Sequence, residues 1–178
     1  SVKLICEAGT GYNNLDLDAA KEKGITVCNI PAYSSQRVAH TTIMMILNLS
    51  STMQTQMKML AHGNHDNFTK NLPVPHVEVN GKTLGIIGMG RIGQALARRA
   101  VASGMRVVYH NRRPLGNEAY INQQLQQLYP TTLQSTPKSK LFRGPRGNQH
   151  PATLNEQPII RYVSKEELLM EADFVSLN

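Results

Sequence analysis

The sequence has little of what marks disulfide-rich, membrane-spanning or highly charged proteins. It contains two cysteines, three phenylalanines and no tryptophan among 178 residues, and only 17% of its residues are charged. Its longest unbroken apolar run, from Ile43 to Leu47, is far shorter than the roughly 20 residues needed to span a bilayer. The composition therefore excludes a small disulfide scaffold and a membrane helix, and it predicts a soluble globular protein.

The two cysteines lack the spacing of a metal site or a redox motif. Cys6 and Cys28 each lie in an apolar, strand-like run, so we expect buried free thiols and a reducing compartment, with the cytoplasm as the default. The chain also begins without an initiator methionine and without the pattern of a signal peptide. We therefore expect a truncated chain.

Acidic residues are scarcer than basic ones, which leaves a net charge of +7 and a pI of about 9.6. Such a charge can indicate a nucleic-acid-binding protein. Here, however, Lys138, Lys140, Arg143 and Arg146 lie in a stretch that contains proline, glycine and serine and almost no aromatic residue. This pattern favours a solvated basic loop, and we expect no nucleic-acid partner.

The first part of the chain has the pattern of a strand–helix–strand unit. Val2 to Cys6 reads as a strand, Asp16 as the N-cap of a short helix that ends at Gly24, and Thr26 to Asn29 as a second strand.

Beyond this unit, Ser35 is expected to cap one long helix that runs to about His62 and ends at Gly63. Its methionines suggest either an adaptable binding groove or core packing, and we favour core packing. These methionines are Met44, Met45, Met53, Met57 and Met59.

A second unit follows the turn at Asn80 and Gly81, where we place a domain boundary. Residues 83–87 read as a strand, 91–103 as a helix and 106–110 as a strand. Near the end, Ser164 and Glu167 form the pattern of a capping box before a helix to about Ala172, and residues 174–177 begin another strand. The alternation of strands and helices predicts a parallel sheet with right-handed crossovers.

One segment departs from this rhythm. Residues 114–158 carry six of the nine prolines, two glutamine-rich runs and the basic stretch, so we interpret them as an inserted, mostly disordered loop.

The sequence Gly88-Met89-Gly90-Arg91-Ile92-Gly93 matches GxGxxG and stands between a predicted strand and a predicted helix. In this context Gly88 permits a tight turn, Gly90 leaves room for a pyrophosphate, and Gly93 lets helix and strand pack closely. The N-terminus of the helix offers N–H groups to the phosphates. The motif predicts a Rossmann-type dinucleotide site, with a merely structural glycine turn as the alternative.

The end of the next strand bears on the choice between NAD and NADP. An NAD site usually has an acidic residue about 20 residues after the glycines, to bind the ribose 2'-hydroxyl. Asn111 stands there, and Arg112 and Arg113 follow it. No carboxylate would repel a 2'-phosphate and two guanidinium groups are available to bind it, which favours NADP over NAD. The alternative is that both arginines are surface charges.

The stretch from Asn80 to Gly93 resembles the signature of the D-2-hydroxyacid dehydrogenases, which include phosphoglycerate, glycerate and glyoxylate/hydroxypyruvate reductases. Residues 7–16 resemble the substrate-domain loop of that family, and residues 29–31 with Val38 and Ala39 resemble the beginning of its interdomain helix. Residues 162–178 are similar to the stretch after its second nucleotide-binding strand. Only residues 114–158 depart from the family pattern.

The resemblance implies an incomplete Rossmann-type α/β domain, residues 80–178, preceded by part of a flavodoxin-like substrate domain, residues 1–33, and by an interdomain helix and connection, residues 34–79. It implies that the loop Gly9-Thr10-Gly11 binds the substrate carboxylate, with Thr10 near the nicotinamide. Arg91 and Ile92 would contact the pyrophosphate. It further implies a small 2-keto or 2-hydroxy acid substrate and a homodimer.

The family's catalytic Arg, Glu and His belong to motifs that this sequence does not reach, so no catalytic residue is assigned. None of its six histidines matches such a position. A metal at His62, His65 and Asp66 is less favoured than a plain surface loop, and no metal site is assigned. Two other possibilities remain open: a nucleotide-sensing binding protein like the co-repressors that resemble this family, and an inactive remnant.

Overall fold

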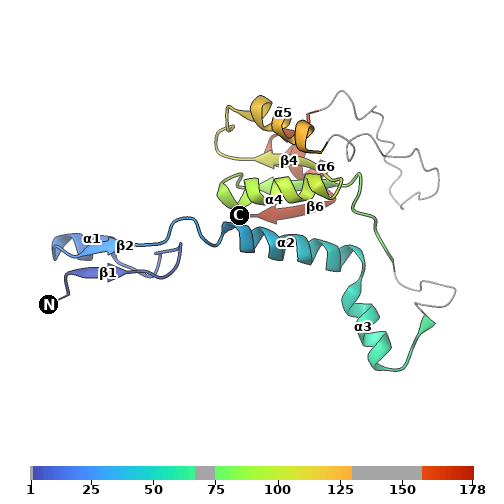
Figure 1. Cartoon of the computed structure of the whole chain (residues 1–178), viewed down its shortest axis with the longest axis horizontal. Helices are drawn as coiled ribbons and strands as arrows, with labels where there is room; N and C mark the ends of the chain where they lie inside the picture. The colour runs from blue at the N-terminus through green and yellow to red at the C-terminus, as the bar shows by residue number, and fades with distance from the viewer. Residues whose placement is uncertain (1, 67–74, 130–157) are drawn as a thin grey trace.

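The core of the protein is a four-stranded parallel sheet with helices on both faces, shown in the computed structural model in Figure 1. The structure describes residues 2–66, 75–129 and 158–178. In spatial order the strands are β5 (Ile160–Tyr162), β4 (Arg106–His110), β3 (Thr83–Ile87) and β6 (Phe174–Leu177). The chain builds the sheet outward from β3 on one side and then crosses to its other side, which is the order of the first four strands of a Rossmann fold.

Sequence patterns placed β3 and β4 at their observed bounds, and β6 was also predicted. Both inner strands are almost continuously buried, as expected for parallel strands covered on two faces. The register pairs Leu84 with Val107 on one side and with Phe174 on the other.

Helices α4 (Arg91–Ala102), α5 (Glu118–Leu128) and α2 (Ser35–Ser50) share one apolar core with one face of the sheet, and α6 (Lys165–Glu171) covers the other face. Helix α4 is amphipathic, and α2 packs against it. Arg99 on α4 donates to the Gln36 Oε1 atom of α2 over 2.7 Å. On the opposite face, Gly85 lets α6 approach β3, because a Cβ atom there would lie 2.6 Å from Leu168.

The N-terminal unit is a separate two-stranded parallel sheet with one helix, as the sequence predicted. It consists of β1 (Leu4–Cys6), α1 (Leu17–Glu22) and β2 (Thr26–Cys28). The Oδ1 atom of Asp16 caps α1 by accepting a hydrogen bond from the Ala19 N–H over 2.9 Å. In Figure 1 this unit lies beyond the N-terminal end of α2, away from the four-stranded sheet.

The cysteines of this unit are free, as predicted, but the prediction that they are buried is wrong. Cys6 and Cys28 are register partners on β1 and β2, and both are exposed. In the described part of the chain, α1 is the only helix of this unit, so much of the small sheet remains uncovered.

The long helix predicted from Ser35 to His62 is two helices. Helix α2 ends at Ser50 and α3 (Met53–Ala61) begins after Thr52, whose φ of 50° is left-handed. The hydroxyls of Ser50 and Ser51 both donate to the Leu47 carbonyl, at 3.0 and 2.6 Å. Such side-chain bonds compete with the helical pattern and accompany the break.

The expectation that the methionine face packs in the core is also wrong. The exposed fractions of Met44, Met45, Met53 and Met57 lie between 43% and 62%. Helix α2 uses a different side for packing, centred on Ala39 and Ile46, which are almost fully buried against the core.

The segment predicted to be a disordered loop contains a helix at its start. Residues 118–128 form α5, because Leu125 is buried in the core and Ile121 packs against it. The Asn122 side chain also holds β5 by two hydrogen bonds to the Ile160 backbone, at 2.8 and 3.0 Å. The glutamine-rich composition concealed this apolar stripe, and β5 was not predicted. Residues 130–157 of the segment lie outside the described residues.

None of the helices in the described ranges is long and apolar enough to cross a membrane.

Candidate functional site

The glycine turn lies at the point where the strand order reverses, between β3 and β6. Gly88 follows β3 with a φ of 100°, and its N–H donates to the His110 carbonyl at the end of β4 over 3.0 Å. On the other side, the N–H of Asn178 donates to the Ile87 carbonyl over 2.9 Å. A Cβ at Gly88 would lie 2.3 Å from the Asn178 carbonyl oxygen. Only glycine fits this turn, and in open α/β sheets such a reversal point is where ligands bind.

The two following glycines meet different surroundings. A Cβ at Gly93 would lie 2.4 Å from the Gly88 carbonyl oxygen, so this glycine lets α4 pack onto the turn. A Cβ at Gly90 would meet nothing within 4 Å, which leaves open space over the turn. The close packing at Gly93 agrees with the motif, and the open space at Gly90 is where the motif predicts a ligand.

The N-terminus of α4 opens directly at this turn. Gly90 is its N-cap and offers no side-chain bond to the first turn of the helix. Arg91 is exposed, and Ile92 is half-buried beside it. The first N–H groups of the helix and its dipole therefore provide an electropositive end suited to phosphate.

Asn111 joins the glycine turn to the end of β4. Its Oδ1 atom accepts a hydrogen bond from the N–H of Met89 over 2.7 Å, and Met89 is itself buried. The carbonyl of Asn111 accepts from the Tyr162 hydroxyl over 3.3 Å. The sequence singled out Asn111 as a cofactor contact, and the structure brings it to the glycine turn by a bond that the sequence did not predict.

Arg112 and Arg113 follow Asn111 and are exposed. Within the described ranges, neither forms an ion pair. They therefore add two positive charges without an ion-pair partner in the described ranges to the segment that follows Asn111.

A buried tyrosine, Tyr109, forms hydrogen bonds to the far end of the segment that carries these arginines. The hydroxyl of Tyr109, a β4 residue with no exposed surface, donates to the Glu118 carboxylate at the start of α5. Burial, together with this bond to Glu118, raises the pKa of Tyr109 to about 12. The same bond holds the pKa of Glu118 below its usual range. The sequence analysis did not predict this pair. The signal that could have indicated it is a tyrosine in a buried strand, followed by a helix whose first residue is a glutamate.

The predicted substrate loop is held by the N-terminal unit. Thr10 Oγ1 donates to the Ile30 carbonyl over 2.9 Å and lies 3.1 Å from Ser34 Oγ, just before α2. The Asn29 side chain donates to the Thr10 carbonyl over 2.8 Å, and the Ile30 N–H donates to the Gly9 carbonyl over 3.0 Å. Every hydrogen bond of Thr10 within the described residues thus stays near the N-terminal unit, and the structure does not bring this loop to the glycine turn.

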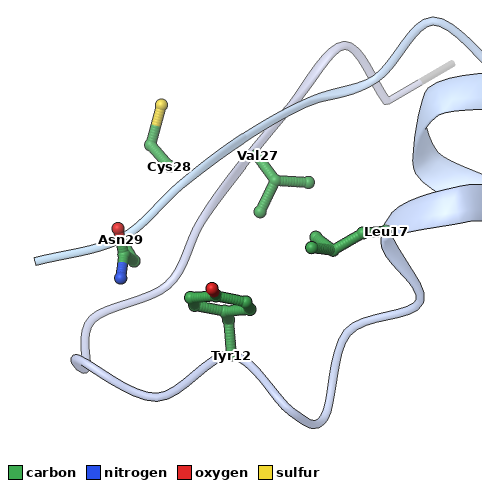
Figure 2. Close-up of a pocket in the computed structure, with 5 residues that line it drawn as sticks. All are labelled: Tyr12, Leu17, Val27, Cys28 and Asn29. Carbon is green, nitrogen blue, oxygen red and sulfur yellow. The ribbon is translucent and has the colours of Figure 1, made fainter. Parts of the chain in front are cut away.

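A pocket of about 140 Å³ lies in the N-terminal unit, and Figure 2 shows the side chains around it. It is lined by Tyr12, Leu17, Val27, Cys28 and Asn29. None of these five side chains is a carboxylic acid, a histidine or a basic group. Its amide, Asn29, is already bonded to the substrate loop.

Three histidines of the described ranges make structural contacts. His110 Nδ1 lies 3.0 Å from the Val163 carbonyl and its ring stacks on Tyr162, while His62 Nδ1 lies 2.7 Å from the Lys58 carbonyl. His40 Nε2 lies 3.0 Å from Arg99. Over residues 2–66, 75–129 and 158–178, no group of three metal-ligating side chains comes together.

Comparison with protein families identifies both parts of the chain. Residues 1–80 match the catalytic domain of the D-isomer specific 2-hydroxyacid dehydrogenases, and residues 43–136 match the NAD-binding domain of the same family.

Two curated relatives agree with this match. The chain is similar to a hydroxypyruvate reductase from Blautia hydrogenotrophica, with 31% identity over 180 aligned residues that cover 100% of this chain and 44% of the relative. It is also similar to a D-3-phosphoglycerate dehydrogenase from Methanocaldococcus jannaschii, with 40% identity over 107 residues, or 60% of this chain and 20% of the relative. The chain thus spans less than half the length of each relative.

Solved structures show the same architecture. A glyoxylate reductase from Paecilomyes thermophila superposes with a TM-score of 0.67 at 31% identity, covering 99% of this chain and 42% of that one. A D-lactate dehydrogenase from Aquifex aeolicus, complexed with NAD and lactic acid, superposes with a TM-score of 0.67 at 29% identity, covering 99% of this chain and 41% of that one. The glycine turn at the strand reversal is therefore part of an NAD-binding domain, and the chain belongs to the family of D-isomer specific 2-hydroxyacid dehydrogenases.

Proposed function

We propose that the protein transfers a hydride between a nicotinamide cofactor and a small 2-keto or D-2-hydroxy acid of the hydroxypyruvate or glyoxylate type. The observation that carries this proposal is the glycine turn at the reversal point of a parallel sheet, with open space at Gly90 and the end of β4 beside it. The names of two relatives, a hydroxypyruvate reductase and a glyoxylate reductase, support the substrate class.

The nicotinamide ring supplies the hydride when the cofactor is bound. Around it, this chain contributes binding and orientation. The space at Gly90 admits the pyrophosphate, the first N–H groups of α4 donate to it, and Arg91 with Ile92 flanks it. Gly88 and Gly93 hold the turn in the required shape.

The loop Gly9-Thr10-Gly11 is proposed to bind the substrate carboxylate through its backbone N–H groups, with Thr10 near the nicotinamide. Its support is the rigid hold on Thr10, whose hydroxyl and carbonyl are both bonded within the unit. Closing this loop onto the glycine turn would require the N-terminal unit to approach the four-stranded sheet, from which it stands apart in Figure 1.

We further propose that NADP(H) is preferred over NAD(H). Asn111 is uncharged, and its Oδ1 atom is engaged by Met89, so this position presents no carboxylate to repel a 2'-phosphate. Arg112 and Arg113 are exposed and have no ion-pair partner in the described ranges, so they are available to bind that phosphate.

We also propose that the complete protein is a cytoplasmic homodimer. Helices α2 and α3 expose a run of apolar side chains, from Met44 at 52% and Leu49 at 71% to Met57 at 62%, that a second copy would cover. Sedimentation of the full-length gene product tests this: a monomer at micromolar concentration would contradict it.

Cofactor binding is tested by titrating the chain with NADPH and NADH by calorimetry. Arg112→Ala should weaken NADPH binding by about tenfold or more, since a charge-assisted bond contributes roughly 1.5 to 3 kcal/mol, and should leave NADH nearly unchanged. Arg98→Ala is the matched control, because Arg98 is an exposed arginine on α4. Asn111→Asp should shift the preference toward NADH. Equal binding of both cofactors, unchanged in Arg112→Ala, would show that the arginines face solvent.

The reaction itself is tested on the full-length gene product by following NADPH oxidation with hydroxypyruvate, glyoxylate and pyruvate. Turnover of one or more of these acids supports the proposal. Cofactor binding without turnover of any of them would favour a nucleotide-sensing role instead.

A further inference from the structure

The segment that leaves β4 is tied at both ends and exposed in the middle. At its beginning, Asn111 is fixed by the Met89 N–H and the Tyr162 hydroxyl. At its end, the N–H of Leu115 donates both to the Tyr109 hydroxyl, over 3.0 Å, and to Glu118 Oε1, over 3.1 Å. Residues 112–114 form a short exposed bridge between these two ties.

The second tie brings the chain back onto the strand it has just left. The Tyr109 hydroxyl reaches Glu118 at the N-terminus of α5, and the Leu115 N–H closes the triangle. The Leu115 side chain packs against the same core that buries Tyr109. We call these three residues, Tyr109, Leu115 and Glu118, the β4–α5 clamp.

The clamp keeps its hydrogen-bonding pattern across neutral pH. Tyr109 stays protonated, since its pKa is raised to about 12, and Glu118 stays ionised, since the pKa of its carboxyl is lowered by the tyrosine hydroxyl. A neutral hydroxyl donor facing a carboxylate is a charge-assisted bond, which is stronger than a neutral one.

We propose that Tyr109 and Glu118 are positioning residues for cofactor specificity: by closing the β4–α5 clamp they hold Arg112 and Arg113 in place to bind the 2'-phosphate of NADP(H). This proposal rests on the NADP preference proposed above. The physical reason is preorganisation. A guanidinium on a tethered bridge loses less conformational freedom on binding than one on a free loop, so more of the phosphate interaction appears as affinity.

The clamp is specific for one end of the cofactor. Its hydrogen bonds join only Tyr109, Leu115 and Glu118, and none of them goes to the glycine turn or to the N-terminus of α4, where the pyrophosphate shared by NADH and NADPH is proposed to bind. Loosening it should therefore weaken NADPH binding and spare NADH. A tyrosine needed only for core packing would affect both cofactors alike.

The experiment compares Tyr109→Phe with the unaltered chain in NADPH and NADH titrations and in hydrogen exchange of residues 111–117. The phenylalanine keeps the buried ring and removes only the hydroxyl. We expect NADPH affinity to fall about three- to tenfold, the range for losing one such bond, NADH affinity to stay within about twofold, and exchange of the segment to quicken. Glu118→Ala should act in the same way, whereas Glu118→Gln keeps an acceptor oxygen and should recover much of the NADPH affinity.

Tyr120→Phe is the matched control, because Tyr120 is an exposed tyrosine on α5 whose hydroxyl contacts only Gln124 among the described residues. It should change neither affinity. If Tyr109→Phe retains the full NADPH preference, or loses NADPH and NADH equally, the positioning role is refuted while the NADP proposal stands. If the unaltered chain shows no preference for NADPH, the cofactor proposal is refuted and this inference with it.

Discussion

The three glycines of the turn, Gly88, Gly90 and Gly93, lack a Cβ for different structural reasons. At Gly93 the missing Cβ makes room for protein, the carbonyl of Gly88, whereas at Gly90 it leaves room for a ligand. Gly88 combines a left-handed φ with close contact to Asn178. A substitution at each position therefore tests a different property of the site.

Gly93→Ala and Gly90→Ala form a matched pair. We expect Gly93→Ala to lower the free energy of unfolding by about 1–3 kcal/mol, because its Cβ would overlap the Gly88 carbonyl. Gly90→Ala should stay within about 0.5 kcal/mol of the unaltered chain yet weaken the binding of both cofactors at least about tenfold. Urea unfolding and cofactor titration measure the two effects. Wild-type cofactor affinity in Gly90→Ala would place the pyrophosphate elsewhere.

The raised pKa of Tyr109 predicts that the free energy of unfolding falls at alkaline pH. Its pKa is about 12 in the folded protein and 10.0 in the reference state, so folding favours the neutral hydroxyl. This contribution is complete below pH 10 and is lost as the pH rises from 10 to 12, because the unfolded chain releases the proton first. Unfolding in urea at about pH 9 and about pH 11 should show a smaller loss of stability for Tyr109→Phe than for the unaltered chain. An equal loss in both proteins would mean that other groups set the limit.

Among the helices, α6 is stabilised both by a local N-cap and by a cluster of ion pairs with β5. Ser164 Oγ accepts from the Glu167 N–H over 3.0 Å, as the capping pattern predicted. Arg161 on β5 then binds Glu167 Oε1 and both carboxylate oxygens of Glu171, at 2.6–2.7 Å. The arginine holds the pKa of the Glu167 carboxyl below its usual value. The contribution of this pair is present at neutral pH and is lost as the pH falls through the lowered pKa.

Ser164→Ala should destabilise the protein by about 1 kcal/mol, the usual contribution of a helix N-cap. Asn117→Ala is its control, since Asn117 is the N-cap of α5 and makes no side-chain cap bond. That variant should stay within about 0.5 kcal/mol. Thermal unfolding compares the two, and equal destabilisation would contradict the assigned role of the cap.

At the scale of the molecule, binding groups and reacting groups are separate requirements. Among the described residues, the one histidine bonded to the glycine turn is His110, which accepts from the Gly88 N–H through its backbone carbonyl while its ring Nδ1 lies 3.0 Å from the Val163 carbonyl. Hydride transfer to a keto acid also needs a group that protonates the nascent alkoxide.

We therefore expect the 178-residue chain, expressed by itself, to bind cofactor without measurable turnover of hydroxypyruvate, glyoxylate or pyruvate. Positioning without an acid–base group loses most of the acceleration. NADPH oxidation followed with each acid measures this. Turnover well above the rate without protein would show that a proton donor among these residues has been overlooked.

Local patterns identified the elements whose signals lie within a few residues. The glycines of residues 88–93, the caps Asp16 and Ser164, and the apolar runs of β3 and β4 specify backbone conformation directly, and each was confirmed in the structure. Asn111 was singled out by its distance along the chain, since a Rossmann unit has a nearly constant length, and the structure bonds it to Met89 of the glycine turn, while its contact with a cofactor stays a prediction.

Tertiary structure decided what depends on distant partners. Helix α5 exists because Leu125 and Asn122 meet the core and β5, although its sequence is rich in glutamine. Cys28 and Met57 are exposed, although an apolar run and a methionine-rich helix face suggested burial, because exposure depends on which elements pack over a residue. The β4–α5 clamp likewise needs Tyr109 and Glu118 to face one another across a returning segment. Sequence alone determined the glycine turn, because the backbone conformation of glycine is a local property. Packing decided the geometry around Arg112 and Arg113, because that geometry is set by contacts between elements.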